Sequence, residues 1–255
     1  ISSSASGTFT ELQAMINNAS SGATISLEKD YEYDSGFNDG KGIFIAKDIT
    51  INGNGHTLNG LSKSRILFVL PTLGENKVTL NNIVFKNGYA KYYGGAIVNF
   101  AGLTVSKCDF EKNYADTSAG AICSVGSLNC KNSNFNKNTA NGSAGAIFSL
   151  NFVNSKSYFN VTDIISGFAD ENSIISALMS NTSIKPATDY ISGCKFTNNV
   201  ALGRGGGAVY AYTHINIASS TFTSNKAKDV GGAVYAAKNL VVKNSKFTKN
   251  TAKLY

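Results

Sequence analysis

Two neighbouring acidic residues are the first candidates for chemistry in this chain. Asp109 and Glu111 flank Phe110, so in a strand that buries Phe110 both carboxylates lie on the outer face, about 7 Å apart. Enzymes that cleave polysaccharides need two or three carboxylates in one groove, or bound Ca²⁺ beside a basic residue. The positions 25 residues before and after this pair carry no acid. We therefore expect a solvated surface here and no enzymatic activity.

Other side chains offer no better catalytic or metal site. His56 and His214 have no evident partner in the sequence for acid–base chemistry. Asp34, Asn38 and Asp39 could supply oxygen ligands to Ca²⁺, but their spacing departs from that of the EF-hand loop and favours a plain loop. We therefore expect no catalytic residue, no metal site and no cofactor.

The composition indicates a folded chain with a polar surface. Its 255 residues are 42% hydrophobic and 15% charged with 25 glycines, which excludes a disordered linker, a coiled coil and collagen. The net charge of +7 comes from scattered lysines without a dense block, which does not indicate nucleic-acid binding. The absence of an 18-residue apolar run predicts no membrane insertion by this segment. The first residue is Ile and no leader precedes Gly7, so we expect a fragment of a longer surface protein.

A repeat of 25 residues organises the sequence. A Gly-Ala pair recurs along the chain, and its alanines are separated by 25, 25, 62 and 25 residues. The pairs end at Ala96, Ala121, Ala146, Ala208 and Ala233. Because 62 is twice 25 plus 12, the spacing predicts one further repeat with an insertion of 12 residues between Ala146 and Ala208.

Each repeat has the same internal pattern. Apolar residues seven and nine positions after the alanine predict a short strand with one buried face, and nine such doublets can be followed along the chain. The first doublet is Ile25 and Leu27, and the one after Ala146 is Val153 and Ser155. In five repeats a phenylalanine and, three residues later, an asparagine follow, and Phe159 lies one place early in the repeat after Ala146. These pairs are Phe110 and Asn113, Phe135 and Asn138, Phe196 and Asn199, Phe222 and Asn225, and Phe247 and Asn250.

Short strands broken by Gly, Asn and Ser predict a parallel β-solenoid. A leucine-rich repeat is excluded because its L-x-x-L-x-L-x-x-N frame is missing, and a helical solenoid is excluded because apolar residues lack helical spacing. Coils stacked at roughly 4.8 Å would place phenylalanines in an internal ladder and asparagines in a ladder at left-handed corners. We predict an all-β fold: a single-stranded, right-handed parallel β-helix of about nine coils, its hand set by the usual crossover rule.

Two motifs resemble those of known surface proteins. G-G-A-I at Gly94–Ile97 and F-x-x-N at Phe110–Asn113 are similar to the repeat of chlamydial polymorphic outer-membrane proteins. The segments Gly7–Gln13 and Ile49–Gly60 resemble the adhesin-like surface proteins of methanogenic archaea. The first Gly of G-G-A is replaced by alanine at Ala119 and Ala144. The resemblance implies a right-handed parallel β-helix within a surface adhesin or its stalk, and it implies no catalytic residue.

The ends of the pattern predict a cap and an inserted segment. Thr8 and Glu11 form a capping box before apolar residues at helical spacing, which predicts an amphipathic helix across the first coil. We assign residues 1–22 to this cap and 23–255 to the β-helix, with the insertion within about 160–190. After Asp170 the insertion has the spacing of a short helix or a distorted strand. Insertions in solenoids often bind ligands, and a tolerated loop without a role is the alternative.

A cluster of tyrosines is the strongest candidate for a binding site. Tyr89, Tyr92 and Tyr93 lie in the corner before Gly94, and Tyr114 follows in the same corner one coil later. Exposed tyrosines on a polar face can stack on sugar rings. We therefore expect contact with a sugar or a protein here, while simple packing at the corner is the alternative.

Asparagines and cysteines could carry covalent modifications. Asn141, Asn160 and Asn181 begin N-x-Ser/Thr sequons in corners or in the insertion, where a glycan would fit. The four cysteines are Cys108, Cys123, Cys130 and Cys194. Three coils should separate Cys108 from Cys194, about 14 Å, which forbids a bond between them. Buried free thiols are expected, and a Cys123–Cys130 bridge is the lesser alternative.

These features favour a non-enzymatic adhesin segment on the outside of a cell. We expect it to bind a surface glycan or protein of a host or neighbouring cell through corner loops and the insertion. Partners from the nucleic-acid class are not expected, and we predict a monomer. The alternatives are a passive stalk that displays another domain, and a polysaccharide lyase or glycoside hydrolase.

Overall fold

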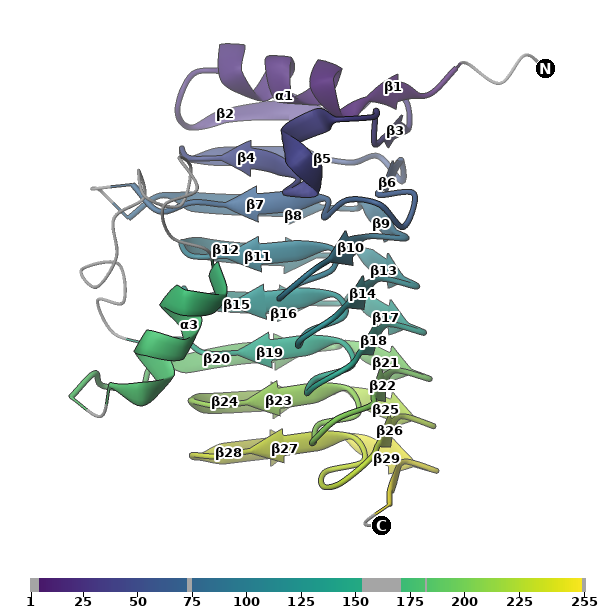
Figure 1. Cartoon of the computed structure of the whole chain (residues 1–255), viewed down its shortest axis with the longest axis vertical. Helices are drawn as coiled ribbons and strands as arrows, with labels where there is room; N and C mark the ends of the chain where they lie inside the picture. The colour runs from purple at the N-terminus through teal and green to yellow at the C-terminus, as the bar shows by residue number, and fades with distance from the viewer. Residues whose placement is uncertain (1–4, 73–74, 153–170, 182, 254–255) are drawn as a thin grey trace.

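A computed structural model describes residues 5–72, 75–152, 171–181 and 183–253 of the chain, which winds into a right-handed parallel β-helix (Figure 1). The strands form four sheets along its axis, called here sheets A to D, and every pairing between named strands is parallel. The longest sheet stacks nine strands, so the expectation of about nine coils is confirmed.

Sheets A and B are the two longest. Sheet A consists of β1 (Gly7–Thr8), β3 (Tyr31–Glu32), β6 (Thr57–Asn59), β9 (Val84–Lys86), β13 (Asp109–Glu111), β17 (Asn134–Asn136), β21 (Lys195–Thr197), β25 (Thr221–Thr223) and β29 (Lys246–Thr248). Sheet B consists of β2 (Ala23–Ser26), β5 (Ile49–Asn52), β8 (Lys77–Asn81), β12 (Gly102–Ser106), β16 (Leu128–Lys131), β20 (Thr188–Ser192), β24 (His214–Ala218) and β28 (Leu240–Lys243).

Sheets C and D complete each coil. Sheet C consists of β4 (Ile43–Ile45), β7 (Leu67–Val69), β11 (Ile97–Asn99), β15 (Ile122–Ser124), β19 (Ile147–Ser149), β23 (Val209–Ala211) and β27 (Val234–Ala236). Sheet D consists of β10 (Tyr89–Ala90), β14 (Tyr114–Ala115), β18 (Thr139–Ala140), β22 (Val200–Ala201), β26 (Lys226–Ala227) and β30 (Thr251–Ala252). The helical elements among the described residues are α1 (Phe9–Asn18), α3 (Glu171–Ser180) and a short 3-10 turn, η1 (Phe37–Gly40).

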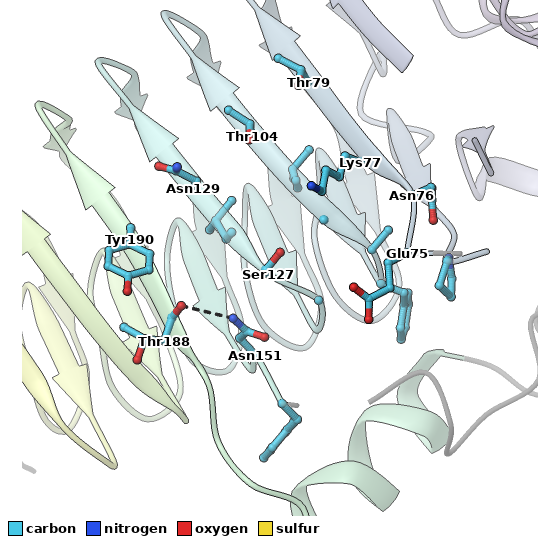
Figure 2. A pocket seen from close by; sticks show the side chains of 18 residues that line it. Glu75, Asn76, Lys77, Thr79, Thr104, Ser127, Asn129, Asn151, Thr188 and Tyr190 are labelled. Carbon is cyan, nitrogen blue, oxygen red and sulfur yellow. Dashed lines mark hydrogen bonds between the residues drawn. The ribbon is translucent and has the colours of Figure 1, made fainter. Parts of the chain in front are cut away.

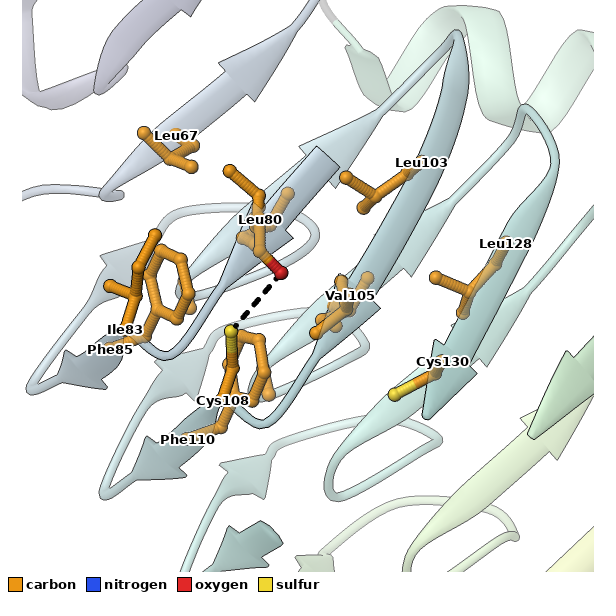
Figure 3. Packing of buried hydrophobic residues seen from close by; sticks show 14 of the residues in the cluster. Leu67, Leu80, Ile83, Phe85, Leu103, Val105, Cys108, Phe110, Leu128 and Cys130 are labelled. Carbon is orange, nitrogen blue, oxygen red and sulfur yellow. Dashed lines mark hydrogen bonds between the residues drawn. The ribbon is translucent and has the colours of Figure 1, made fainter. Parts of the chain in front are cut away.

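The predicted phenylalanine ladder runs through the core behind sheet A. Neighbouring rings have centroids 4.6–4.7 Å apart and lie within 10° of parallel. The ladder consists of Phe85, Phe110, Phe135, Phe196, Phe222 and Phe247. Figure 3 shows its first rings packed among the inward leucines and valines of sheet B. Offset-stacked aromatic pairs of this kind stabilise beyond the area that they bury.

A buried asparagine ladder follows the phenylalanines. Asn138 donates from Nδ2 to Oδ1 of Asn199 (3.0 Å) and to the carbonyl of Phe110 (2.9 Å), and its own Oδ1 accepts from Asn113. The same contacts recur at Asn199 and Asn225. These asparagines do not adopt the left-handed backbone predicted for them. The residue before each one does, with φ between 53° and 57° at Lys112, Lys137, Asn198, Ser224 and Lys249.

The Gly-Ala corners require glycine for two different reasons. A Cβ at Gly120 would lie 2.3 Å from the carbonyl oxygen of Gly145 in the next coil, so the backbones approach too closely for any side chain. The preceding position instead has a left-handed backbone, with φ of 66° at Gly94. Ala119 and Ala144 occupy that position with φ of 64° and 61°, and both are buried. The two departures from G-G-A thus combine backbone strain with apolar burial.

The length predicted for the insertion is wrong. Strand pairing steps by 25 residues from β15 to β19 but by 61 residues from β16 to β20, so the insertion adds 36 residues rather than 12. β16 pairs directly with β20, which leaves no coil for the doublet predicted at Val153 and Ser155. Those two residues and Phe159 lie outside the described residues. A spacing of 62 residues fits either one repeat with a long insertion or two repeats with a short one. The periodicity alone does not distinguish them, and the prediction of two repeats is wrong.

The register of the first strand also differs from the prediction. Ile25 and Leu27 are both buried, as predicted, but Ala23 pairs with Ile49 and Ile25 with Ile51, so the pairing differs by two residues from the predicted match of Ile25 with Ile49. A shift of two residues keeps the same side chains facing inward, so the alternation of apolar and polar residues cannot detect it.

Helix α1 covers the open face of the first coil, as predicted. The capping box joins Thr8 and Glu11, and the helix buries Phe9, Leu12 and Ile16. Lys47 donates from Nζ to the carbonyl oxygens of Ile16, Asn17 and Ala19, at 3.0, 3.1 and 2.7 Å, and so holds the carboxyl end of the helix. Neither described helix is long and apolar enough to cross a membrane.

A second apolar cluster lies outside the coils, on the outer face of sheet C. It contains the column Phe68, Val98, Cys123, Phe148 and Tyr210, which places one residue of each successive strand in register. Helix α3 packs on this cluster through Ile174, Ile175 and Leu178. The insertion therefore contains a helix, which decides between the two predicted alternatives, and α3 lies beside sheet C in Figure 1.

Candidate ligand-binding groove

A groove of about 610 Å³ crosses the outer face of sheet B next to the insertion (Figure 2). Strands β8, β12, β16 and β20 form its floor, and the turns between sheets C and B form one side. The groove is lined by Pro71, Glu75, Asn76, Lys77, Thr79, Phe100, Ala101, Gly102, Leu103, Thr104, Gly126, Ser127, Leu128, Asn129, Asn151, Phe152, Thr188 and Tyr190.

The floor of the groove is a row of polar side chains in register. Thr79, Thr104, Asn129 and Tyr190 pair in successive strands, so their side chains follow one another at the strand spacing of about 4.8 Å. Tyr190 is 51% exposed, the largest exposed fraction among the large hydrophobic residues of the described chain. A smaller hollow of about 480 Å³ shares Thr79 with the groove and extends the row to Thr50.

The base of the insertion forms one end of the groove. Phe152 makes an antiparallel bridge to Pro186, and the amide of Ala187 donates to the carbonyl of Asn151 at 2.8 Å. The two chain segments of the insertion are thereby held together where they leave the coil. Asn151, Phe152 and Thr188 from this base line the groove, so the insertion and the floor are parts of one surface.

A buried carboxylate fixes this base to the coil. Asp189 faces inward at the position that Leu128 and Ile215 occupy in neighbouring strands. Its side chain accepts hydrogen bonds from the amide of Leu128 (2.8 Å), Oγ of Ser149 (2.6 Å) and Nδ2 of Asn151 (2.8 Å). Complete burial raises the pKa of Asp189 to about 7, although its three donors favour the charged form.

The other end of the groove is built on Asn76. Its side chain accepts from the amide of Thr72 (2.8 Å) and donates to the carbonyl of Leu70 (3.0 Å), which shapes the turn that precedes β8. Glu75 and Lys77 flank Asn76 and bring one charge of each sign to this end. The rest of the lining is uncharged apart from these two residues.

The predicted tyrosine cluster lies away from this groove, at sheet D. Tyr89 and Tyr114 pair in register and stack with centroids 6.1 Å apart, as the repeat predicted. The hydroxyl of Tyr89 donates to Asp116 at 2.6 Å, which raises the pKa of Tyr89 to about 12. Tyr93 is 6% exposed and packs in the second apolar cluster with Tyr92 against it, so the expectation of an exposed Tyr93 is wrong.

The other candidate chemical residues lie apart from one another. Asp109 accepts a hydrogen bond from Nδ2 of Asn134 at 2.7 Å on the outside of sheet A. Contrary to the prediction, His56 has a partner: its Nδ1 lies 3.0 Å from Oδ1 of Asp30 in the preceding coil. Nδ1 of His214 accepts from the amide of Asn239 at 3.2 Å. Within the described residues, no three His, Cys, Asp or Glu side chains are grouped so that they could hold a metal ion.

The calcium-like loop and the sequons have the following places. Asp34 accepts hydrogen bonds from the amide and the hydroxyl of Thr10, so it joins its loop to helix α1. Asn141 is exposed in the corner between β18 and β19, and Asn181 follows helix α3 and is half-buried. Asn160 lies outside the described residues.

Sequence reasoning missed the residues that build the groove. Tyr190 lies between two inward positions, Asp189 and Ile191, which makes it an outward residue of a sheet B strand. The signal was present in Asp189, an acid in a column of apolar residues. The additional repeat predicted between Ala146 and Ala208 hides this signal, because it separates Ile191 from its true neighbour, Cys130.

Comparison with known proteins identifies the repeat. Residues 193–212 and 219–237 match the family model of the Chlamydia polymorphic membrane protein repeat. No curated protein and no solved structure matches the chain. The two matched segments cover the successive coils that contain β21 to β23 and β25 to β27, directly after the groove strand β20. Two adjacent coils of this β-helix are therefore similar to the Chlamydia polymorphic membrane protein repeat.

Proposed function

We propose that this chain is a segment of a cell-surface adhesin that binds a glycan in the groove on sheet B without cleaving it. The observation that carries the proposal is the exposed ring of Tyr190 beside a floor of hydroxyl and amide groups. The match to a membrane-protein repeat supports a place on the outside of a cell. The partner is a glycan of a host or neighbouring cell.

The chemistry of the groove suits a sugar chain. Thr79, Thr104 and Asn129 can donate and accept hydrogen bonds at regular intervals, and Tyr190 offers an apolar ring that can cover a sugar face. The groove also lies across several strands, so that an extended chain would cross one coil after another. A nucleic acid would call for a row of cations instead, and Lys77 is the one cation of the lining.

The acids near the groove support binding rather than hydrolysis. Glu75 is the only exposed carboxylate among the residues that line the groove of about 610 Å³, whereas glycoside hydrolases use two facing carboxylates. Asp189 lies beneath the floor and is occupied by three hydrogen bonds.

A glycan array probed with the labelled chain tests the proposal. We expect the wild type to bind a defined set of glycans and Tyr190→Ala to weaken that binding by about fivefold or more, since an aromatic contact contributes about 1 kcal/mol or more. Tyr92→Ala is the matched control, because it removes a tyrosine at the sheet D corner. Thermal melting of both variants verifies that they fold.

Each other result points to a different function. If Tyr92→Ala loses binding and Tyr190→Ala retains it, the site is the corner formed by Tyr89, Tyr92, Tyr93 and Tyr114. If the bound glycan is shortened, the chain is a lyase or hydrolase. If no glycan binds, the rigid stack of ladders favours a passive stalk that displays another domain.

A further inference from the structure

Two cysteines on neighbouring coils meet inside the β-helix. Cys130 ends the inward doublet of β16, and Cys194 precedes β21 in the next coil. Their Sγ atoms are 3.7 Å apart, and both side chains are buried in the main hydrophobic core. Figure 3 shows Cys130 directed into this core below Val105. No part of the proposed glycan site includes either sulfur atom.

The other two cysteines have different neighbours. Sγ of Cys108 lies 3.5 Å from the carbonyl oxygen of Leu80, in the same relation that Cys194 has to Cys130. Leu80 occupies the same column as Cys130, two coils earlier. Cys108 therefore faces an apolar side chain where Cys194 faces a thiol (Figure 3). Cys123 belongs to the second apolar cluster on the outer face of sheet C. The Cys123–Cys130 bridge considered from the sequence is therefore wrong, since the two belong to different clusters.

We propose that Cys130 and Cys194 form a disulfide in the secreted protein. The bond would join the coil before the insertion to the coil after it and close a segment of 64 residues that contains the insertion. The sulfur atoms need to approach by about 1.7 Å to reach the usual bond length of about 2.05 Å. Rotation of the two side chains brings them together, because Cys130 lies in β16, which pairs with β20, and Cys194 lies in the turn that joins β20 to β21.

The oxidant is a low-molecular-weight disulfide, and the exchange proceeds in two balanced steps. The thiolate of Cys194 attacks one sulfur of the oxidant, forms a mixed disulfide and releases one small thiol. The thiolate of Cys130 then attacks Sγ of Cys194 and releases the second small thiol. The protein loses two protons and two electrons in total, and the small disulfide is reduced to two thiols.

The pKa values of the buried thiols differ in the folded chain. The hydrogen bond from Cys130 lowers the pKa of Cys194, whereas contact with Cys194, together with burial, raises the pKa of Cys130. Burial raises the pKa of Cys108 to about 12, so that thiol is a poor nucleophile. Because the core is closed in the folded chain, exchange takes place while the coils assemble or open transiently.

The experiment compares the full chain secreted into the bacterial periplasm, an oxidising compartment, with the chain refolded from urea in oxidised glutathione. In both preparations we expect two titratable thiols, instead of four, after unfolding. Peptide mapping should give a single disulfide-linked pair of peptides, which contains Cys130 and Cys194. Closure of a loop of this length should raise the melting temperature by roughly 5–10 °C over the reduced protein.

The chain itself supplies matched variants. Ser133 and Ser220 occupy the position of Cys194 in the adjacent coils, so Cys194→Ser introduces a residue that this column already contains. In the same way, Cys130→Val introduces the residue type of Val105, its neighbour in the preceding coil. Each should abolish the melting shift on reduction, while Cys108→Ser should retain it. Four free thiols in both preparations, or a linked pair that includes Cys108 or Cys123, would overturn the proposal.

Discussion

Sheets A and B of this β-helix follow the same axis but differ in how uniformly the same residue type recurs in successive coils. In the core behind sheet A, phenylalanine stacks on phenylalanine and asparagine bonds to asparagine across the insertion without a change. In sheet B, the coil that follows the insertion replaces an inward apolar residue by Asp189 and an outward threonine or asparagine by Tyr190. Uniform columns hold the coils together, and the coil that departs from them carries the candidate groove.

The strongest way to break this comparison is to interrupt the asparagine ladder. Asn138→Ala removes the hydrogen bonds to Phe110 and Asn199 and leaves buried groups of Asn113 without their acceptor. We expect the free energy of unfolding to fall by roughly 3–5 kcal/mol, measured by urea denaturation. Asn136→Ala, on the outer face of the same sheet A strand, is the control and should change it by less than about 0.5 kcal/mol. Equal losses at the two positions would contradict the ladder's role.

Neighbouring corner residues should respond in different ways to the loss or gain of one methyl group. Gly120→Ala places a Cβ against the carbonyl of Gly145 and should cost about 3 kcal/mol. Ala119→Gly relieves a left-handed backbone but gives up a buried methyl group, so the net change should stay within about 1 kcal/mol. Chemical denaturation of both variants checks this, and a larger loss at Ala119 would show that close backbone approach does not decide the corner.

The buried acid in sheet B gives a dependence on pH. Asp189 holds its proton up to about pH 7 in the folded chain but only to about pH 4 when unfolded. Its contribution to stability is therefore fully present below about pH 4 and is lost as pH rises through 7, with a slope of at most about 1.4 kcal/mol per pH unit.

Asp189→Asn removes this titration and tests it. We expect the difference in unfolding free energy, wild type minus Asp189→Asn, to decrease between pH 4 and 7. Ser149→Ala sharpens the test, because it deletes a donor that lowers the pKa of folded Asp189 and should extend the upper end of this window to higher pH. A difference that does not vary with pH would exclude a protonated Asp189.

The smallest effect on stability is expected at the exposed residue of the same coil. Tyr190→Thr restores the residue type of Thr79 and Thr104 in that column, so the unfolding free energy should change by less than about 0.5 kcal/mol. Glycan binding should weaken in this variant even though its melting temperature does not move. A clear loss of stability would make Tyr190 part of the framework rather than of a binding surface.

Periodicity predicted the ladders because identical coils place identical residues in one column. Phenylalanines pair with phenylalanines and Tyr89 pairs with Tyr114 as the spacing requires, and asparagines bond to asparagines. Periodicity failed where several answers satisfy the same arithmetic. The spacing of 62 fitted two repeats as well as one, and a shift of two residues in β2 kept the same face inward.

The candidate site was harder to predict because exposure at a corner depends on what lies outside the coil. Tyr93 is buried by an apolar cluster that covers the outside of sheet C, whereas repeat position alone suggested an exposed ring. The partner of His56 is Asp30, 26 residues away in another coil, and no local motif joins them. The groove itself needs the insertion beside β20, which a period of 25 does not describe.

The insertion shows how this architecture accepts foreign sequence. The turn from β15 to β16 takes three residues, whereas the corresponding connection after β19 runs from Leu150 to Ala187, and the strands on both sides keep their register. The bridge between Phe152 and Pro186 brings the two ends of the insertion close together, so the insertion spans no greater distance in the coil than a short turn would. A peptide or small domain with adjacent termini should therefore be tolerated between β19 and β20, and this turn is a suitable site for displaying inserted sequences.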